Sequence, residues 1–174
     1  MIAAIVGPSG AGKDTLINAA CRLRPDLRLV RRVITRPSGA GGEDFEGVTE
    51  DEFERRRALG DFALCWQAHA LSYGIPKVQL LGPGTILFNG SRAILSEALR
   101  NFPGLRVILV TAPDAVLARR LSARGRETEA DIAARLERAG FSLPDGIIAE
   151  TVVNDGTIEA GASALLAALQ PVRA

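Results

Sequence analysis

The chain has 174 residues with 21 basic and 20 acidic side chains, so its formal charge is +1. This length fits a single domain that removes about 70% of its unfolded surface from water, and we expect it to fold without disulfides or a structural metal. The balanced charge argues against a protein that binds nucleic acid through bulk positive charge. Cys21 and Cys65 form no ligand cluster, and the first apolar run is too short to span a membrane, so we expect a cytoplasmic protein.

Short apolar runs alternate with longer segments of helical period, which predicts a parallel sheet covered by helices on both faces. The expected strands are 2–6, 29–34, 85–89, 106–110 and 151–153. The expected helices are 13–23, 50–59, 92–101, 113–123, 129–139 and 158–169. Thr49 and Glu52 have the spacing of a capping box at the start of the second helix. Segment 61–73 predicts a small antiparallel pair that turns at about 68–70.

A phosphate-binding motif lies between the first strand and the first helix. The sequence Gly7-Pro-Ser-Gly-Ala-Gly-Lys13 matches G-x-x-x-x-G-K, of which this composition would give roughly 0.02 matches by chance. Glycines allow backbone N–H groups to surround phosphate oxygens, and the lysine adds a positive charge at a helix N-terminus. We therefore expect a nucleotide to contact Gly7, Pro8, Ser9, Gly10, Ala11, Gly12, Lys13, Asp14 and Thr15, with Lys13 catalytic.

The sequence offers two candidate metal ligands at this site. Asp14 stands where such loops usually offer a Mg²⁺-binding hydroxyl, and the hydroxyl follows as Thr15. The strand that normally supplies a second acidic residue ends in Asn89. We expect Thr15 to be the protein's metal ligand and most of the Mg²⁺ shell to come from ATP phosphates and water.

An arginine-rich segment follows the fourth expected helix. Arg120, Arg124 and Arg135 could close over a transferring phosphoryl group as a mobile lid at about 120–138, and we predict a catalytic role for them. The alternative is that these side chains are solvated and favour a helix dipole.

The middle of the chain resembles guanylate kinases. The motifs that carry the resemblance are Thr35-Arg-Pro37, Gly41-Gly-Glu-Asp-Phe45, Gly60-Asp-Phe62, Tyr73-Gly-Ile-Pro76, Arg124-Gly-Arg-Glu127 and Val152-Val-Asn-Asp155. The resemblance implies an α/β P-loop kinase: a three-layer sandwich with a parallel five-stranded sheet, an inserted acceptor-binding β/α subdomain and the lid. It implies one domain, 1–174, with a core of 1–34 and 77–174 and an insert at about 35–76.

Several residues depart from the guanylate kinase pattern. Leu64 stands in the place of the glutamate that binds guanine, Ile75 replaces a hydroxyl residue, and Phe45 replaces a phosphate-binding tyrosine. A pocket that hydrogen-bonds its substrate can discriminate by about 10⁴ to 10⁵, and a leucine in place of the carboxylate would abolish that pairing. The chain therefore resembles a kinase that has lost guanine recognition.

The chain is more similar to the ribose 1,5-bisphosphate phosphokinases of bacterial phosphonate breakdown. The shared motifs include Arg32-Val-Ile-Thr-Arg-Pro37, Phe62-Ala-Leu-Cys-Trp-Gln-Ala-His69 and Asn89-Gly-Ser-Arg92. This resemblance implies that ATP and Mg²⁺ convert ribose 1,5-bisphosphate into 5-phosphoribosyl 1-diphosphate (PRPP). It implies that the nucleotide also contacts Asn154 and that the acceptor contacts Arg32, Arg36, Glu43, Asp44, His69, Tyr73 and Arg92. His69 has a structural hydrogen bond as its alternative role, and Glu43 and Asp44 have a solvated loop as theirs.

Two other functions remain open at this point. One is guanylate kinase or another nucleoside monophosphate kinase. The other, which we favour least, is a non-catalytic binding domain, because such a module would not need Gly12, Lys13 and the lid arginines together. We expect small-molecule partners, a sugar phosphate and ATP, and neither nucleic acid nor membrane; a homodimer remains an open alternative.

Overall fold

The computed structural model describes residues 1–37, 39, 43–123 and 142–170. Its main sheet has five parallel strands in the order β2-β7-β1-β8-β9. These strands are β1 (Ile2–Val6), β2 (Leu27–Leu29), β7 (Thr85–Asn89), β8 (Arg106–Thr111) and β9 (Glu150–Val153). The expected five-stranded parallel sheet is confirmed.

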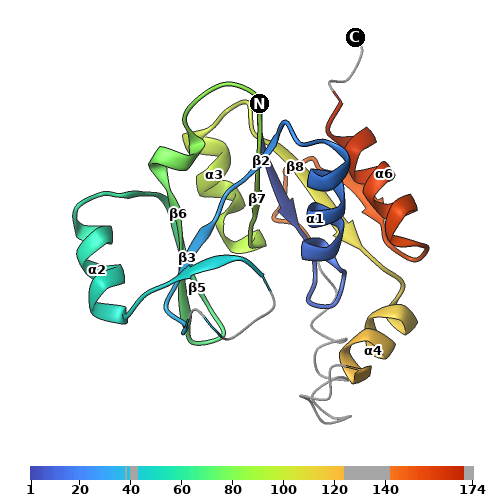
Figure 1. The fold of residues 1–174 in the computed structure, drawn as a ribbon, viewed down its shortest axis with the longest axis horizontal. Coiled ribbons are helices and arrows are strands. Elements are labelled where there is room, and N and C mark those ends of the chain that lie inside the picture. Colours follow the sequence, from blue (N-terminus) through green and yellow to red (C-terminus); the bar gives the residue numbers. More distant parts are fainter. Residues whose placement is uncertain (38, 40–42, 124–141, 171–174) are drawn as a thin grey trace.

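Helices cover both faces of this sheet, so the expected three-layer α/β sandwich is also confirmed (Figure 1). One face packs against α1 (Lys13–Leu23), α4 (Asp114–Ala123) and α6 (Ile158–Ala168), and the other against α3 (Leu95–Asn101). Successive side chains of β1 point to opposite faces of the sheet. Ala3 and Ile5 belong to the core cluster on one face, and Ala4 and Val6 belong to the cluster on the other. Both faces of a central parallel strand are apolar because both are buried.

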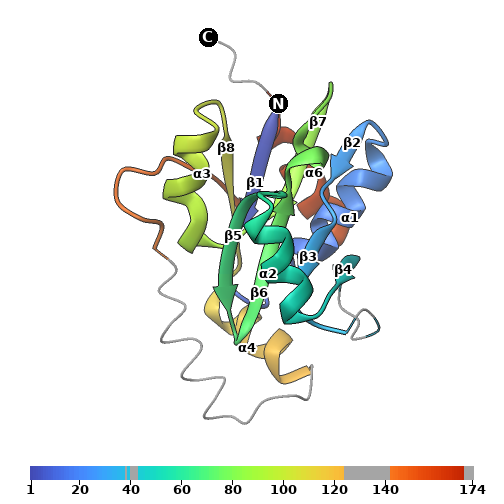
Figure 2. The same ribbon diagram turned by 90° about the vertical axis from the view of Figure 1, so that its left-hand side faces the viewer.

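A second, smaller sheet stands beside the main one, with the order β4-β3-β6-β5 (Figure 2). Its strands are β3 (Arg32–Ile34), β4 (Phe45–Gly47), β5 (Phe62–Ala68) and β6 (Leu71–Pro76). Helix α2 (Glu50–Ala58) packs on one face through Phe53, whose ring stacks on Phe62 with centroids 4.8 Å apart. The other face joins the core of the main domain through Leu64, Trp66 and Ile75.

The expected single strand at 29–34 is wrong. Two strands occupy this region, and β2 pairs in the main sheet whereas β3 pairs in the small one. The chain leaves the main sheet after the Val30 N–H donates to the Leu87 carbonyl at 2.8 Å. Gln79 then holds the junction, because its side chain accepts from the Arg31 N–H at 2.7 Å and donates to the Arg31 carbonyl at 2.9 Å. A run of apolar and basic residues carries no local sign of such a change of sheet.

Most other boundaries agree with the expectations to within about two residues. The capping box is confirmed in part, since the Thr49 hydroxyl accepts from the Glu52 N–H at 3.2 Å. The expected helix at 92–101 is divided into a 3₁₀ turn, η3 (Arg92–Ile94), and α3. A further 3₁₀ turn, η2 (Lys77–Leu80), follows β6, and the short strand β4 was not expected. The expected helix at 129–139 lies outside the described residues. Among the described helices, none has the length and apolar character needed to cross a bilayer.

Candidate active site

The phosphate loop connects β1 to α1, and its backbone conformation depends on glycine. Gly12, the residue before the helix, has φ 85°, in the left-handed region that L side chains rarely adopt. Gly7 has no room for a Cβ, which would collide with the Val110 carbonyl oxygen. The loop thus passes close to the backbone of β8 and ends at the positive end of α1, an arrangement suited to binding phosphate.

The side chain of Lys13 folds over this loop. Its ammonium group donates to the carbonyl oxygens of Gly7 at 2.8 Å and Pro8 at 3.1 Å. A half-buried ammonium held at the mouth of a glycine-rich loop can add a point charge to phosphate oxygens bound there.

Two residues from distant parts of the chain contact the backbone of the phosphate loop. Asn154, which follows β9 and is only 5% exposed, donates its side-chain amide to the Ala11 carbonyl at 2.8 Å. Arg120 on α4 approaches the same carbonyl at 3.5 Å. Asn154 was expected at the nucleotide and Arg120 was expected to be catalytic, and the structure places both beside the backbone of the phosphate loop.

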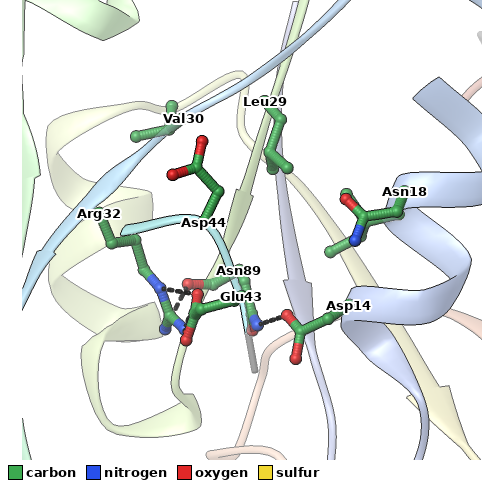
Figure 3. A pocket seen from close by; sticks show the side chains of 9 residues that line it. Asp14, Asn18, Leu29, Val30, Arg32, Glu43, Asp44 and Asn89 are labelled. Atoms are coloured by element: carbon green, nitrogen blue, oxygen red, sulfur yellow. Dashed lines mark hydrogen bonds and ion pairs between the residues drawn. The ribbon is translucent and has the colours of Figure 1, made fainter. Parts of the chain in front are cut away.

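A polar cleft opens next to the loop, between α1, the β2–β3 junction, the end of β7 and the segment 43–44 (Figure 3). Polar atoms dominate its wall, and Leu29 and Val30 close one side. The lining residues are Asp14, Ile17, Asn18, Leu29, Val30, Arg32, Glu43, Asp44 and Asn89. Four of them, Asp14, Arg32, Glu43 and Asp44, were expected at the site from the sequence.

A chain of hydrogen bonds crosses this cleft (Figure 3). Arg32 donates from Nε to Glu43 Oε2 at 3.1 Å, from Nη2 to the same carboxylate at 2.6 Å, and from Nη1 to the Asn89 carbonyl at 3.0 Å. Asn89 in turn donates from Nδ2 to Asp14 Oδ1 at 2.6 Å. These hydrogen bonds therefore link the insert, the end of β7 and the first turn of α1.

Two stacked aromatic rings support Arg32 from the small sheet. Trp66 and Tyr73 are cross-strand partners with ring centroids 5.2 Å apart and planes at 6°. The Arg32 guanidinium lies 5.3 Å from the Tyr73 centroid and 5.9 Å from that of Trp66, within cation–π range. Burial raises the pKa of the Tyr73 phenol above its usual range, so this ring is neutral at physiological pH.

The other expected acceptor residues occupy varied positions. Arg36 lies over the Phe45 ring at 4.4 Å, and Arg92 begins η3 just beyond β7. His69 is exposed at the β5–β6 turn, where it and Ala70 have φ of 52° and 59°. The lid residues Arg124 and Arg135 lie outside the described part of the chain.

The positions that would read a guanine base are buried in the core. Leu64 is 1% exposed and Ile75 is fully buried, and both pack in one cluster with Trp66 and Phe88. These side chains offer no hydrogen bond to a base.

The residues present fit a Mg²⁺ ion that is held largely by phosphate oxygens. Within the described residues, no group of three or more His, Cys, Asp or Glu side chains could enclose a metal. Asp14 and Asn89 offer hard oxygen atoms at the cleft, whereas Thr15 is exposed on the first turn of α1. Sparse protein ligation suits an ion that keeps waters and binds substrate phosphates.

Five lining residues were not among the expected site residues: Ile17, Asn18, Leu29, Val30 and Asn89. Trp66, which supports Arg32, was not among them either. Asn89 had a usable signal, because ligands of parallel α/β sheets bind beyond the carboxyl ends of the strands. Trp66 carried no such signal, because an aromatic residue in a strand of alternating apolar residues is equally typical of an ordinary core position.

The chain is similar to known proteins in sequence and in fold. No family model matches the chain. The chain is 45% identical over 177 residues to ribose 1,5-bisphosphate phosphokinase PhnN of Ruegeria sp., covering 99% of the chain and 93% of that protein. It is 46% identical to the PhnN of Rhizobium etli, covering 95% of the chain and 87% of that protein.

A bifunctional ribose 1,5-bisphosphokinase-thymidine phosphorylase of Cupriavidus necator is 48% identical over 95% of the chain, but the match spans only 28% of that protein. Among solved structures, a guanylate kinase from Anaplasma phagocytophilum gives a TM-score of 0.74 at 20% identity and covers 97% of the chain and 84% of that protein. At this identity the structural match shows the fold alone, that of a guanylate-kinase-like P-loop kinase. The sequence matches over nearly the full length of the PhnN relatives go further: the chain belongs to the ribose 1,5-bisphosphate phosphokinase family.

Proposed function

We propose that the chain transfers the γ-phosphoryl group of ATP to the 1-phosphate of ribose 1,5-bisphosphate, forming PRPP and ADP. The observation that carries this proposal is the packing of Leu64 and Ile75 in the core beside an intact phosphate loop. The acceptor surface can therefore hold a phosphorylated sugar but offers no base recognition. Membership of the family supports the same substrate.

The transfer needs little acid–base chemistry from the protein. The second pKa of a phosphate monoester is about 6, so the attacking oxygen is already largely ionised at neutral pH. Alignment and charge stabilisation then remain, with Lys13 on the β- and γ-phosphates and Arg120 next to the loop. Arg124 and Arg135 complete the positive charge around the transferring group in this proposal.

Mg²⁺ would neutralise charge on the ATP phosphates when bound, and Thr15 or Asp14 would be its protein ligand. Asp14 has the better position for contact with the cleft, because it lines the cleft and accepts from Asn89 at 2.6 Å. Thr15, by contrast, carries a hydroxyl, the group that usually binds Mg²⁺ in such loops.

Side-by-side acceptor assays test the proposal. With ATP and Mg²⁺, ribose 1,5-bisphosphate should release ADP, and GMP should be at least about 10³ less efficient in kcat/KM, because its polar base edges would be left unpaired. Ribose 5-phosphate, which lacks the reacting 1-phosphate, should not be an acceptor. Comparable kcat/KM for GMP and the sugar bisphosphate would instead establish a nucleoside monophosphate kinase.

A further inference from the structure

Arg32 is held at several points by the protein itself. Its Nε, Nη1 and Nη2 all donate to Glu43 or to the Asn89 carbonyl, and its guanidinium rests on the Trp66–Tyr73 pair. The residue is only 7% exposed. An arginine that binds a substrate phosphate must present its fork to the ligand, whereas this fork is directed at a carboxylate of the same chain.

Both residues line the cleft, and Glu43 is the more exposed partner. Its side chain is 20% exposed, against 9% for Arg32, so the carboxylate is more accessible to a ligand than the guanidinium that holds it. The pair fixes Glu43 at the cleft wall, where Asp14 and Asn89 contribute further side chains (Figure 3).

The groups on this wall select a particular kind of ligand atom. Asp14, Glu43 and Asp44 are carboxylates, and the charge of Glu43 is balanced by Arg32 while Asp44 pairs with Arg31 at 2.9 Å on the exposed rim. Carboxylate oxygens accept hydrogen bonds and repel phosphates. A sugar hydroxyl is a donor that fits the Glu43 carboxylate, so the phosphates of the acceptor must lie away from Glu43.

We propose that Glu43 accepts a hydrogen bond from a ring hydroxyl of the acceptor ribose and that Arg32 is the positioning residue that orients it, rather than a phosphate ligand. This inference rests on the proposed function and adds a specificity to it. The enzyme distinguishes ribose 1,5-bisphosphate from its deoxy analogues through the Arg32–Glu43 pair.

The test measures kcat/KM for ribose 1,5-bisphosphate and for its 2-deoxy and 3-deoxy analogues. The wild-type enzyme should prefer the ribose compound over one of the two analogues by about 10- to 100-fold, as expected for a lost hydrogen bond to a charged group. Glu43→Gln should lower kcat/KM for the ribose compound by about 10-fold or more and change that analogue's value by less than about threefold. KM for ATP should stay the same in the variant.

Arg32→Lys keeps the positive charge but not the fork, so it should show the same selective loss, and the double variant should lose no more than either single one. Glu46→Gln is the matched control, because Glu46 forms a similar ion pair with Arg56 at 2.7 Å and does not line the cleft. It should leave the ribose preference unchanged. Melting temperatures of all variants show whether each is folded; if Arg32→Lys does not fold, Glu43→Gln decides alone.

Several results would overturn the inference. Equal losses on ribose and on both deoxy analogues in Glu43→Gln would remove the hydroxyl contact, and a raised Mg²⁺ requirement in that variant would make Glu43 a metal-shell residue. Weaker binding of all three sugar bisphosphates in Arg32→Lys, with normal discrimination, would make Arg32 a phosphate ligand. Failure of the wild-type enzyme to use ribose 1,5-bisphosphate would refute the proposed function itself, whereas turnover without discrimination would refute only this inference.

Discussion

Replacing Gly12 by alanine tests whether the phosphate loop depends on one backbone conformation. Gly12 has φ 85° at the start of α1, and an added Cβ would lie 2.5 Å from the Asn154 side-chain nitrogen. That nitrogen donates to the Ala11 carbonyl at 2.8 Å. The methyl group must therefore move Asn154 away from the loop that Asn154 supports.

The expected loss of folding stability in Gly12→Ala has two parts. A non-glycine residue in the left-handed region costs about 1–2 kcal/mol, and loss of the Asn154 hydrogen bond costs about 0.5–1.5 kcal/mol more. Gly12→Ala should thus lower the free energy of unfolding by about 1.5–3.5 kcal/mol. For a chain of this size that corresponds to a decrease in Tm of about 3–14 °C.

Urea denaturation of four proteins measures this cost: wild type, Gly12→Ala, Asn154→Ala and the double variant. In the Asn154→Ala background the collision is absent, so Gly12→Ala should cost only the backbone strain of about 1–2 kcal/mol. Gly104→Ala is the control, because a Cβ at Gly104 meets nothing within 4 Å. It should change stability by no more than about 1 kcal/mol, and in the stabilising direction. Equal costs of Gly12→Ala in both backgrounds would refute the role assigned to the Asn154 contact, and a cost below about 0.5 kcal/mol would refute the strain as well.

Three further predictions concern the site and the small sheet. Lys13→Ala should lower kcat by at least about 10² in the coupled ADP assay with little change in Tm, because it removes transition-state charge and little packing; near-normal turnover would contradict the assignment. Because a hydroxyl is the usual Mg²⁺ ligand of such loops, Thr15→Val should raise the Mg²⁺ concentration for half-maximal rate more than Asp14→Asn does; the reverse order would assign the metal to Asp14, which lines the cleft. Burial raises the pKa of the Cys65 thiol to about 11, so this thiol is protonated at pH 8 and should react with iodoacetamide at least tenfold more slowly in the folded protein than in urea. Equal rates in the two states would show that burial does not protect it.

The sequence was informative where function depends on local backbone chemistry. The glycine spacing before Lys13 predicted a phosphate loop, and β1, α1 and β7 have the expected bounds. Apolar runs with turn residues between them predicted the parallel sheet, because a strand buried on both faces requires apolar side chains throughout. The departures at Leu64 and Ile75 could be read without coordinates, since a leucine or isoleucine cannot hydrogen-bond a base in any fold.

The tertiary structure decided which distant residues share a wall. Arg32, Glu43, Asn89 and Asp14 come from four separate segments, and only the packing of the small sheet against the main one aligns them in one hydrogen-bonded chain. The break of 29–34 into two strands belongs to the same class, because Gln79, which holds the junction, is 48 residues away from Arg31. Arg32 illustrates the difference most directly: the family resemblance implies contact with the acceptor, but its surroundings of a carboxylate, a carbonyl and two aromatic rings depend on long-range contacts that no local pattern encodes.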